Sequence, residues 1–123
     1  MARVRGKDTV PELVVRRLVH KMGFRYRLHA RDLPGRPDLV LPRLRKVILV
    51  HGCYWHRHPR CKLARLPKSR LDFWLPKLMG NRQRDLKNER LLRKLGWEAF
   101  TVWECQISKT ETLAEKLKRF LRS

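Results

Sequence analysis

Acidic side chains are scarce in this chain of 123 residues. Asp and Glu together number 11 against 31 Lys and Arg, which gives a formal net charge of +20. Such an imbalance costs free energy through self-repulsion unless a polyanion supplies the opposite charge. A small domain stays soluble with about 2 to 8 units of net charge. The charge therefore predicts a nucleic-acid-binding protein, and a merely solvated basic surface is the alternative.

Long hydrophobic runs are also missing. No stretch of 18 apolar residues occurs, and residues 1–8 are charged instead of forming the apolar segment of a signal peptide. These absences predict a soluble, cytoplasmic protein that makes no use of a membrane. No internal repeat and no linker rich in Gly and Ser divides the chain, whose length suits one domain. We therefore expect a single domain over residues 1–123.

Cysteine is rare, with only Cys53, Cys61 and Cys105. In a reducing compartment these are not expected to form a disulfide framework, which leaves metal binding or simple burial. Cys53, His58 and Cys61 lie within nine residues of a broken, polar segment, and Cys105 follows the last predicted strand. Four Cys and His ligands suit a closed tetrahedral site for structural Zn²⁺, which would hold the irregular loop in place. Alternatively, Cys105 is an ordinary buried cysteine and the others are loop residues.

The hydrophobic pattern alternates between the periods of helices and strands. Thr9 and Glu12 have the spacing of a capping box, and apolar residues then recur at helical spacing until Gly23. Gly96 marks the end of a helix in which Leu91, Leu92 and Leu95 share one face. The predicted helices cover residues 10–22, 82–95 and a C-terminal segment with Leu113, Leu117, Phe120 and Leu121, and the predicted strands cover residues 24–29, 38–41, 46–50 and 99–103. This order predicts an α/β fold with a small mixed β-sheet flanked by helices.

Asp38 is the first catalytic candidate, because it closes the segment GRPD where a loop enters a predicted strand. A carboxylate there is well placed to bind Mg²⁺, which prefers oxygen ligands; the alternative is a turn aspartate that caps its own backbone. The next predicted strand ends near His51, and His56 comes five residues later. Two imidazoles beside one carboxylate can supply a general base for water and a charge stabiliser for phosphorus. The pattern predicts phosphodiester hydrolysis, unless both histidines merely pack in a core.

Aromatic residues are interleaved with basic ones in the middle of the chain. Tyr54 and Trp55 adjoin several Arg and Lys residues, and a second aromatic pair follows at residues 73–74. Aromatic wedges push between base steps at a cost on the order of a few kcal/mol, least where base pairing is already poor. These residues are therefore candidates for detecting a mismatch. The alternative, a core position, is the prediction for Trp97 and Trp103, which lie in an apolar strand region.

Four blocks together resemble the very short patch repair (Vsr) family of DNA mismatch endonucleases. They are LPGRPD at residues 33–38, HGCYWH at 51–56, FW at 73–74 and WEC at 103–105, and the match extends from residue 6 to residue 105. The resemblance implies a restriction-endonuclease-like fold. It also implies an enzyme that nicks one strand of double-stranded DNA 5' of the thymine in a T:G mispair.

The same resemblance assigns roles to individual residues. It implies that Asp38 binds Mg²⁺, that His56 activates water and that His51 is a second active-site histidine. Glu12 and Asp85, which the pattern alone marks as a helix cap and a solvated helix residue, match acidic active-site positions. The implied zinc ligands are Cys53, His58, Cys61 and Cys105, and the implied intercalating residues are Tyr54, Trp55 and Trp74.

The second Mg²⁺ ligand is expected from the backbone. The strand at residues 47–52 lacks the acidic-x-Lys triplet that usually accompanies a Pro-Asp pair in nucleases, and a carbonyl near Val50 is chemically adequate. Val50 stands where the Vsr family often has Thr, a change that leaves a backbone carbonyl intact. The segment at residues 58–61 is one residue longer than in the family, and little chain precedes residue 6, which predicts a different grip on DNA.

The leading hypothesis is a monomeric, Mg²⁺-dependent mismatch endonuclease with a structural Zn²⁺ and with mismatch-repair factors as candidate partners. In it, His56 takes a proton from the attacking water beside the metal bound by Asp38. One alternative is a zinc-containing DNA-binding module without chemistry, and another is a Vsr-like nicking nuclease with a different target. A third is a basic protein that binds RNA.

Overall fold

The computed structural model describes residues 9–123, and the Gly-Lys-Asp block at residues 6–8 lies outside them. The described elements are, in order, α1 (Val10–Lys21), β1 (Arg27–Leu28), β2 (Leu39–Leu41), β3 (Lys46–His51), the 3-10 turn η1 (Lys62–Ala64), α2 (Leu71–Lys94), β4 (Glu98–Trp103), the 3-10 turn η2 (Glu104–Ser108) and α3 (Thr110–Arg122). No helix among these residues is long and apolar enough to span a membrane.

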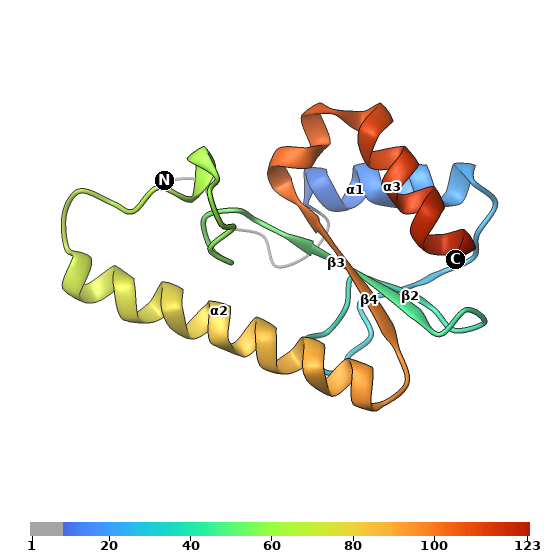
Figure 1. Cartoon of the computed structure of the whole chain (residues 1–123), viewed down its shortest axis with the longest axis horizontal. Coiled ribbons are helices and arrows are strands. Elements are labelled where there is room, and N and C mark those ends of the chain that lie inside the picture. Colours follow the sequence, from blue (N-terminus) through green and yellow to red (C-terminus); the bar gives the residue numbers. More distant parts are fainter. Residues whose placement is uncertain (1–8) are drawn as a thin grey trace.

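The strands form one mixed sheet in the order β1-β2-β3-β4 (Figure 1). β1, β2 and β3 pair antiparallel, whereas β4 runs parallel to β3 in a register that places Val50 opposite Val102. A parallel neighbour requires a long crossover. Residues 52–97, which include α2, supply that crossover. The predicted α/β fold with a small mixed sheet flanked by helices is therefore confirmed.

Helices α1 and α3 cover one face of the sheet (Figure 1). Alternate residues of the strands point to this face, where they meet apolar residues that recur at helical spacing. The buried cluster comprises Val15, Val19, Leu39, Leu41, Ile48, Val102, Leu113, Leu117 and Leu121. Each of these side chains is at most 2 % exposed, and burying one contributes about 1.5–3 kcal/mol. This layer holds α1, and with it Glu12, against the sheet.

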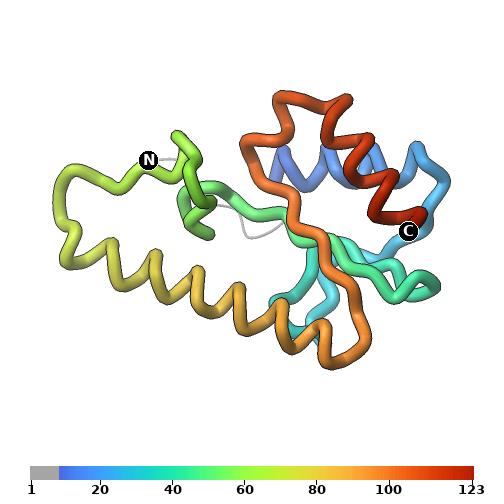
Figure 2. Tube along the Cα trace, in the orientation of Figure 1, coloured from blue at the N-terminus to red at the C-terminus, as the bar shows by residue number. Residues whose placement is uncertain are grey.

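The C-terminal half of α2 covers the opposite face. Leu92 and Trp97 pack there against Val40, Val47 and Leu49. Because both faces are covered, β2 and β3 are buried along nearly their whole length, as their continuous apolar runs predict. The N-terminal half of α2 extends past the sheet and runs beside the loop that follows β3 (Figure 2).

Helix α2 is much longer than predicted. It begins at Leu71 instead of residue 82, although Pro76 lies inside it and removes one helical hydrogen bond. Contacts with the loop after β3 compensate, because the side-chain amide of Asn81 donates to the backbone carbonyl of Trp55 (3.3 Å). The weak local propensity of this segment is thus overridden by tertiary structure.

The prediction for residues 24–29 was also wrong. The strand expected over residues 24–29 is reduced to β1, because His29 has a φ of +51° and leaves the extended conformation. Of the three leucines predicted to share one face of the second helix, only Leu92 is buried, whereas Leu91 and Leu95 are 37 % and 52 % exposed. The sheet therefore contacts a narrower stripe of α2 than the apolar pattern suggested.

Candidate active site and Cys/His cluster

A cavity of about 590 Å³ opens where β3 leaves the sheet. Asp38 and Val50 line it from neighbouring strands, and Glu12 lines it from α1. His51 and His56 line it from the end of β3 and from the loop beyond. Asp38 and His56 therefore face one shared cavity, which the sequence hypothesis requires.

Asp38 is held where β2 begins. Its backbone N–H donates to the carbonyl of Ile48 (3.1 Å), and its Oδ2 accepts from the backbone N–H of Val50 (2.7 Å). Burial raises the pKa of Asp38 to about 7 against the effect of the Val50 hydrogen bond, and the carboxyl group of Glu12 adds to the increase. A divalent cation bound between the two carboxyl groups would offset this cost, in addition to the Arg16 side chain that contacts Glu12.

Glu12 stands in the first turn of α1. The predicted N-cap is confirmed, because Oγ1 of Thr9 accepts from the N–H of Glu12 (3.4 Å). The side chain of Glu12 is only 2 % exposed; its carboxylate contacts Arg16 and lies 3.0 and 3.1 Å from Nε2 of His29. Donor atoms of Glu12, His29 and Asp38 all lie within 4.8 Å of one another, so this group could hold a metal ion.

The rings of His51 and His56 stack, with centroids 3.9 Å apart and planes 8° from parallel. Nδ1 of His56 lies 2.5 Å from Oδ2 of Asp85, a residue of α2. This contact leaves Nε2 of His56 available to another partner. Burial and the neighbouring His56 lower the pKa of His51 to about 4, although Asp85 opposes the change. His51 is therefore neutral near pH 7.

Cys53, His58, Cys61 and Cys105 converge although the last lies far along the chain. Their donor atoms are within 4.8 Å of one another, and Nδ1 of His58 is 3.6 Å from Sγ of Cys53 and 3.4 Å from Sγ of Cys105. Burial raises the pKa of the Cys53 thiol to about 12, so a bound metal must displace its proton. Three thiols and one imidazole can hold a metal ion tetrahedrally. The cluster joins the loop after β3 to η2.

Trp103 connects this cluster to the stacked pair of His51 and His56. Its ring stacks on His58 at a centroid distance of 4.2 Å and meets the edge of His51 at 5.3 Å. The prediction of a core position is right for Trp97, which is 9 % exposed, but Trp103 is only half-buried. A strand end that leaves the sheet places its last side chain at the rim of the core instead of inside it.

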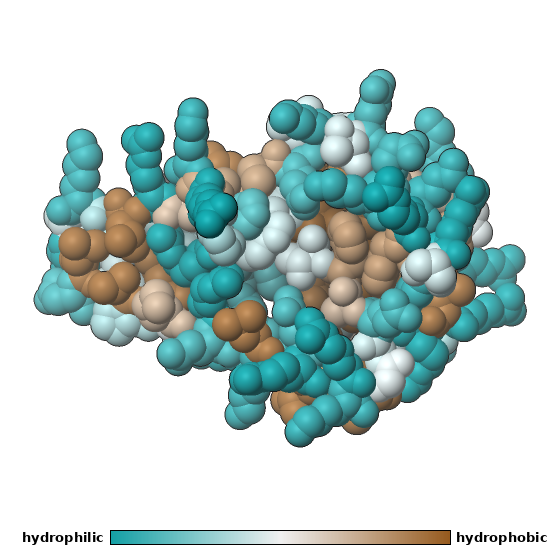
Figure 3. All heavy atoms as spheres, viewed as in Figure 1, coloured by the Kyte–Doolittle hydropathy of each residue, from teal (hydrophilic) through white to brown (hydrophobic). Residues whose placement is uncertain are grey.

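Trp55 and Trp74 bring the two aromatic segments together, with ring centroids 6.1 Å apart. Tyr54 packs edge-on against Trp55, and Phe73 packs edge-on against Trp74. Figure 3 shows hydrophobic side chains gathered at the end of the molecule where α2 begins. The exposed apolar residues of this region are Leu63, Leu66, Leu71, Phe73, Leu75 and Met79. Exposed apolar and aromatic surface within a basic protein suits contact with nucleic-acid bases.

Comparison with known proteins places these features in a family. The sequence profile described as DNA mismatch endonuclease Vsr matches residues 1–63, about half of the chain. The chain belongs to the Vsr family. The resemblance recognised from four short blocks is therefore confirmed, and the protein is an endonuclease of the Vsr type.

Relatives in the Vsr family match almost the whole chain. The nicking enzyme V.XorIIP of Xanthomonas oryzae pv. oryzae is 49 % identical over 121 residues, which cover 98 % of this chain and 88 % of that protein. The nicking enzyme V.NmeAIP of Neisseria meningitidis serogroup A is 40 % identical over 122 residues, which cover 99 % and 86 %. DNA mismatch endonuclease Vsr of Escherichia coli K12 is 38 % identical over 116 residues, which cover 94 % and 74 %.

Solved structures support the fold of this Vsr-family protein. The catalytic domain of the homing endonuclease I-Bth0305I superposes with a TM-score of 0.63 and covers 92 % of this chain and 94 % of that domain. The sequence identity is 16 %, so the likeness concerns the fold alone. The expected restriction-endonuclease-like architecture is thereby confirmed.

The fold brings together the residues that the Vsr resemblance singled out, and it adds one that sequence reasoning missed. Glu12, Asp38 and both histidines share a cavity, and the four Cys and His residues form one cluster. His29 was overlooked because an isolated histidine in a predicted strand has no visible partner. The signal lay in strand pairing: β1 and β2 pair Leu28 with Leu39, so the next residues, His29 and Asp38, lie opposite each other.

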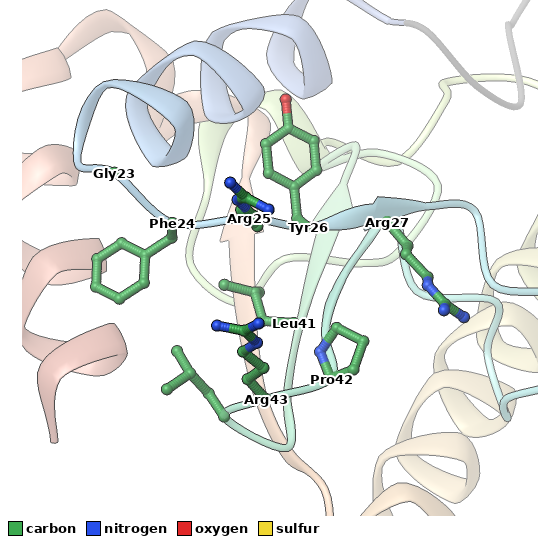
Figure 4. Close-up of a pocket in the computed structure, with 9 residues that line it drawn as sticks. Gly23, Phe24, Arg25, Tyr26, Arg27, Leu41, Pro42 and Arg43 are labelled. Carbon is green, nitrogen blue, oxygen red and sulfur yellow. The ribbon is translucent and has the colours of Figure 1, made fainter.

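A second cavity of about 490 Å³ lies at the other end of the strands, beside the turn between β2 and β3. Arg25, Arg27 and Arg43 line it, and Figure 4 shows Tyr26, which precedes β1, pointing toward α1. None of its lining residues, all of which lie in the described part of the chain, is acidic or a histidine. This cavity offers no ligands for a cation, and the catalytic candidates of the Vsr-family protein belong to the first cavity.

Proposed function

We propose that this protein nicks one strand of double-stranded DNA 5' of the thymine in a T:G mispair. The observation that carries the proposal is the shared cavity, which the carboxyl groups of Glu12 and Asp38 line together with two imidazoles where β3 leaves the sheet. A net charge of +20 attracts the phosphate backbone. The relatives, described as nicking enzymes and as a DNA mismatch endonuclease, point to the same reaction.

Mg²⁺ fits the donor set of the cavity. Asp38 is partly and Glu12 fully buried, and their carboxyl groups lie close enough together to bind one ion. Burial is the main cause of the raised pKa of Asp38. The backbone N–H and C=O of one residue in a β-strand point to the same side of that strand. Because the N–H of Val50 faces Asp38, its carbonyl lies on that side too. We assign the ion to Asp38 and the Val50 carbonyl, with Glu12 placed to hold a metal-bound water. When bound, the ion would polarise the scissile phosphate.

His56 is the general base of the proposed reaction. Asp85 accepts a hydrogen bond from Nδ1–H of His56, which in the neutral ring leaves Nε2 as the nitrogen that takes a proton from the water that attacks phosphorus. The bond between phosphorus and O3' breaks and O3' takes up a proton from solvent, which leaves a 3'-hydroxyl and a 5'-phosphate. His51 is neutral near pH 7 and therefore donates an N–H to a phosphate oxygen. This is the role of charge stabiliser that the sequence suggested for one of the two imidazoles.

Tyr54, Trp55 and Trp74 supply mismatch selectivity. Their rings form one packed group at the edge of the cavity and at the start of α2. Inserting such a group between bases costs on the order of a few kcal/mol of unstacking, and a mispaired step costs least. Selection for a T:G mispair follows from that difference together with base contacts.

Cys53, His58, Cys61 and Cys105 bind one structural Zn²⁺ in this proposal. The three thiols and the imidazole match the ligand types of a closed zinc site. The bound ion would hold the loop that carries His56 and the aromatic residues relative to β4. A monomer suffices for the reaction, since one chain provides every group in the cavity, and mismatch-repair factors remain candidate partners.

Strand-labelled duplexes test the proposal. The wild-type protein is expected to nick the thymine strand of a T:G duplex with Mg²⁺, and to leave a T:A duplex and an Mg²⁺-free reaction uncut. Asp38→Ala is expected to abolish nicking while DNA binding remains. Asp32→Ala changes an exposed aspartate of the preceding loop and serves as the matched control, which stays active.

Each contrary outcome has a definite meaning. Full activity of Asp38→Ala rejects the metal site. Salt-sensitive DNA binding without cleavage under any condition indicates a zinc-containing DNA-binding module. Cleavage at a different mispair or at a matched site indicates a Vsr-like nickase with another target.

A further inference from the structure

His29 contacts both acidic residues of the cavity. Nε2 of its ring lies 3.0 and 3.1 Å from the two carboxylate oxygens of Glu12, and its backbone N–H donates to the backbone carbonyl of Asp38 (3.0 Å). Its φ of +51° is a left-handed conformation that costs a residue other than glycine on the order of 1 kcal/mol. The fold therefore holds this residue in a sparsely populated conformation at the point where it links the two acids.

The orientation of the Glu12 carboxylate depends on such contacts. The group is almost fully buried and lies near Asp38, which repels it when both are charged. Arg16, one turn later in α1, contacts one oxygen, and the ring of His29 reaches both. A donor aimed at both oxygens favours one orientation of a carboxylate. Outer hydrogen bonds of this kind commonly decide how tightly a metal is held.

We propose that His29 is a positioning residue of the metal site, whose Nε2–H holds the Glu12 carboxylate toward Asp38 and so strengthens the binding of a divalent cation. The inference rests on the proposed function, which places the cation at Asp38. It deepens that function by naming a residue that acts through Glu12 instead of touching the substrate.

Direct ligation by His29 is the competing role. One nitrogen cannot donate a hydrogen to Glu12 and bind a metal at the same time. An imidazole ligand also favours transition metals over Mg²⁺, whereas a positioning residue leaves the ligand set, and hence the preference among metals, unchanged. The ratio of Mn²⁺ to Mg²⁺ affinity therefore separates the two roles.

Mn²⁺ binding to the zinc-loaded protein without DNA tests the inference, with free Mn²⁺ followed by its EPR signal and Mg²⁺ added as competitor. His29→Asn tolerates the left-handed backbone but is too short to reach Glu12, so we expect about tenfold weaker binding of both ions. His29→Gln reaches further with an amide N–H and is expected to restore most of the affinity. His20→Asn, at an exposed histidine of α1, is the matched control and leaves binding unchanged.

The outcomes separate this inference from the function on which it rests. Unchanged Mn²⁺ affinity in His29→Asn, with full zinc content and unaltered circular dichroism, overturns the inference and leaves the proposed function intact. Equal losses in His29→Asn and His29→Gln with a reduced ratio of Mn²⁺ to Mg²⁺ affinity also overturn it, because the imidazole is then a ligand. A wild-type protein that binds no Mn²⁺ removes the metal site and the inference together.

Discussion

Replacing Asp38 by Asn should stabilise the protein in the absence of divalent cations. The amide oxygen can still accept from the N–H of Val50, and the amide N–H gives the nearby Glu12 a donor. The change removes a charge that burial makes costly, because the pKa of Asp38 is raised from 3.8 to about 7. The same substitution should abolish nicking, so stability and activity are expected to change in opposite directions.

The size of the effect follows from that pKa. A carboxyl group whose pKa moves from 3.8 to about 7 on folding loses up to roughly 4 kcal/mol of folding free energy when it ionises. The hydrogen bond and the charge of the nearby Glu12 account for part of this rise, and the Asn amide is itself costly to bury. We expect Asp38→Asn to gain about 1–2 kcal/mol at about pH 8.5, which raises Tm by roughly 4–8 °C in a chain of this length.

The sign of the pH dependence is determined by the direction of the change. The folded protein keeps a proton on Asp38 between about pH 4 and pH 7, where the unfolded chain has lost it, so wild-type stability falls as pH rises through this window. Asp38→Asn has no carboxyl group at this position, so its stability lacks this dependence on pH. The difference in Tm should therefore be small near pH 4, grow up to about pH 7 and stay constant above it.

Calorimetry of both proteins without Mg²⁺, at several pH values, measures the difference. Asp32→Asn, at an exposed aspartate, should show no such pH-dependent gap. Added Mg²⁺ should stabilise the wild type and not Asp38→Asn, because only a protein that binds the ion gains from it. A variant no more stable than the wild type at pH 8.5, or a gap that is equal at all pH values, would refute the reasoning.

Three further predictions concern the other groups. Cys105→Ser should lose the single equivalent of zinc and lower Tm, and metal analysis showing that zinc is retained would contradict the ligand set. His56→Ala should slow single-turnover nicking at least about 100-fold without weakening DNA binding, and Asp85→Asn should slow nicking less. An unchanged rate in His56→Ala would show that His56 is not the general base. Trp74→Ala should reduce the preference for T:G over T:A duplexes about tenfold in competitive nicking. An unaltered preference would show that Trp74 does not select the mispair.

Much of the site could be predicted because its chemistry is concentrated in short blocks. Asp38 and His51 lie at the ends of adjacent buried strands, so a correct sheet brings them together without further information. The Cys/His cluster was predictable because the chain has only three cysteines to assign. In both cases residue type and local pattern agree with the long-range arrangement.

The contacts that sequence reasoning missed depend on register and on tertiary structure. His29 meets Asp38 only through the pairing of β1 with β2, and its left-handed backbone ends the strand that pattern alone would extend. The contact between Asp85 and His56 needs the true length and direction of α2. Pro76 hides the true start of α2 from a reading of the sequence. An interior proline breaks a helix reliably only where no other contact supports the segment.

Helix α2 also fixes the spacing between the aromatic group, the histidine pair and the sheet. Trp74 lies near its beginning, Asp85 near its middle and Leu92, which anchors it to the sheet, near its end. With a rise of about 1.5 Å per residue, the first two are separated by roughly 16 Å along a rod that does not bend easily. Under the proposed function, that length sets the distance between the ring that contacts the distorted base pair and the histidine that acts on the phosphate 5' of its thymine.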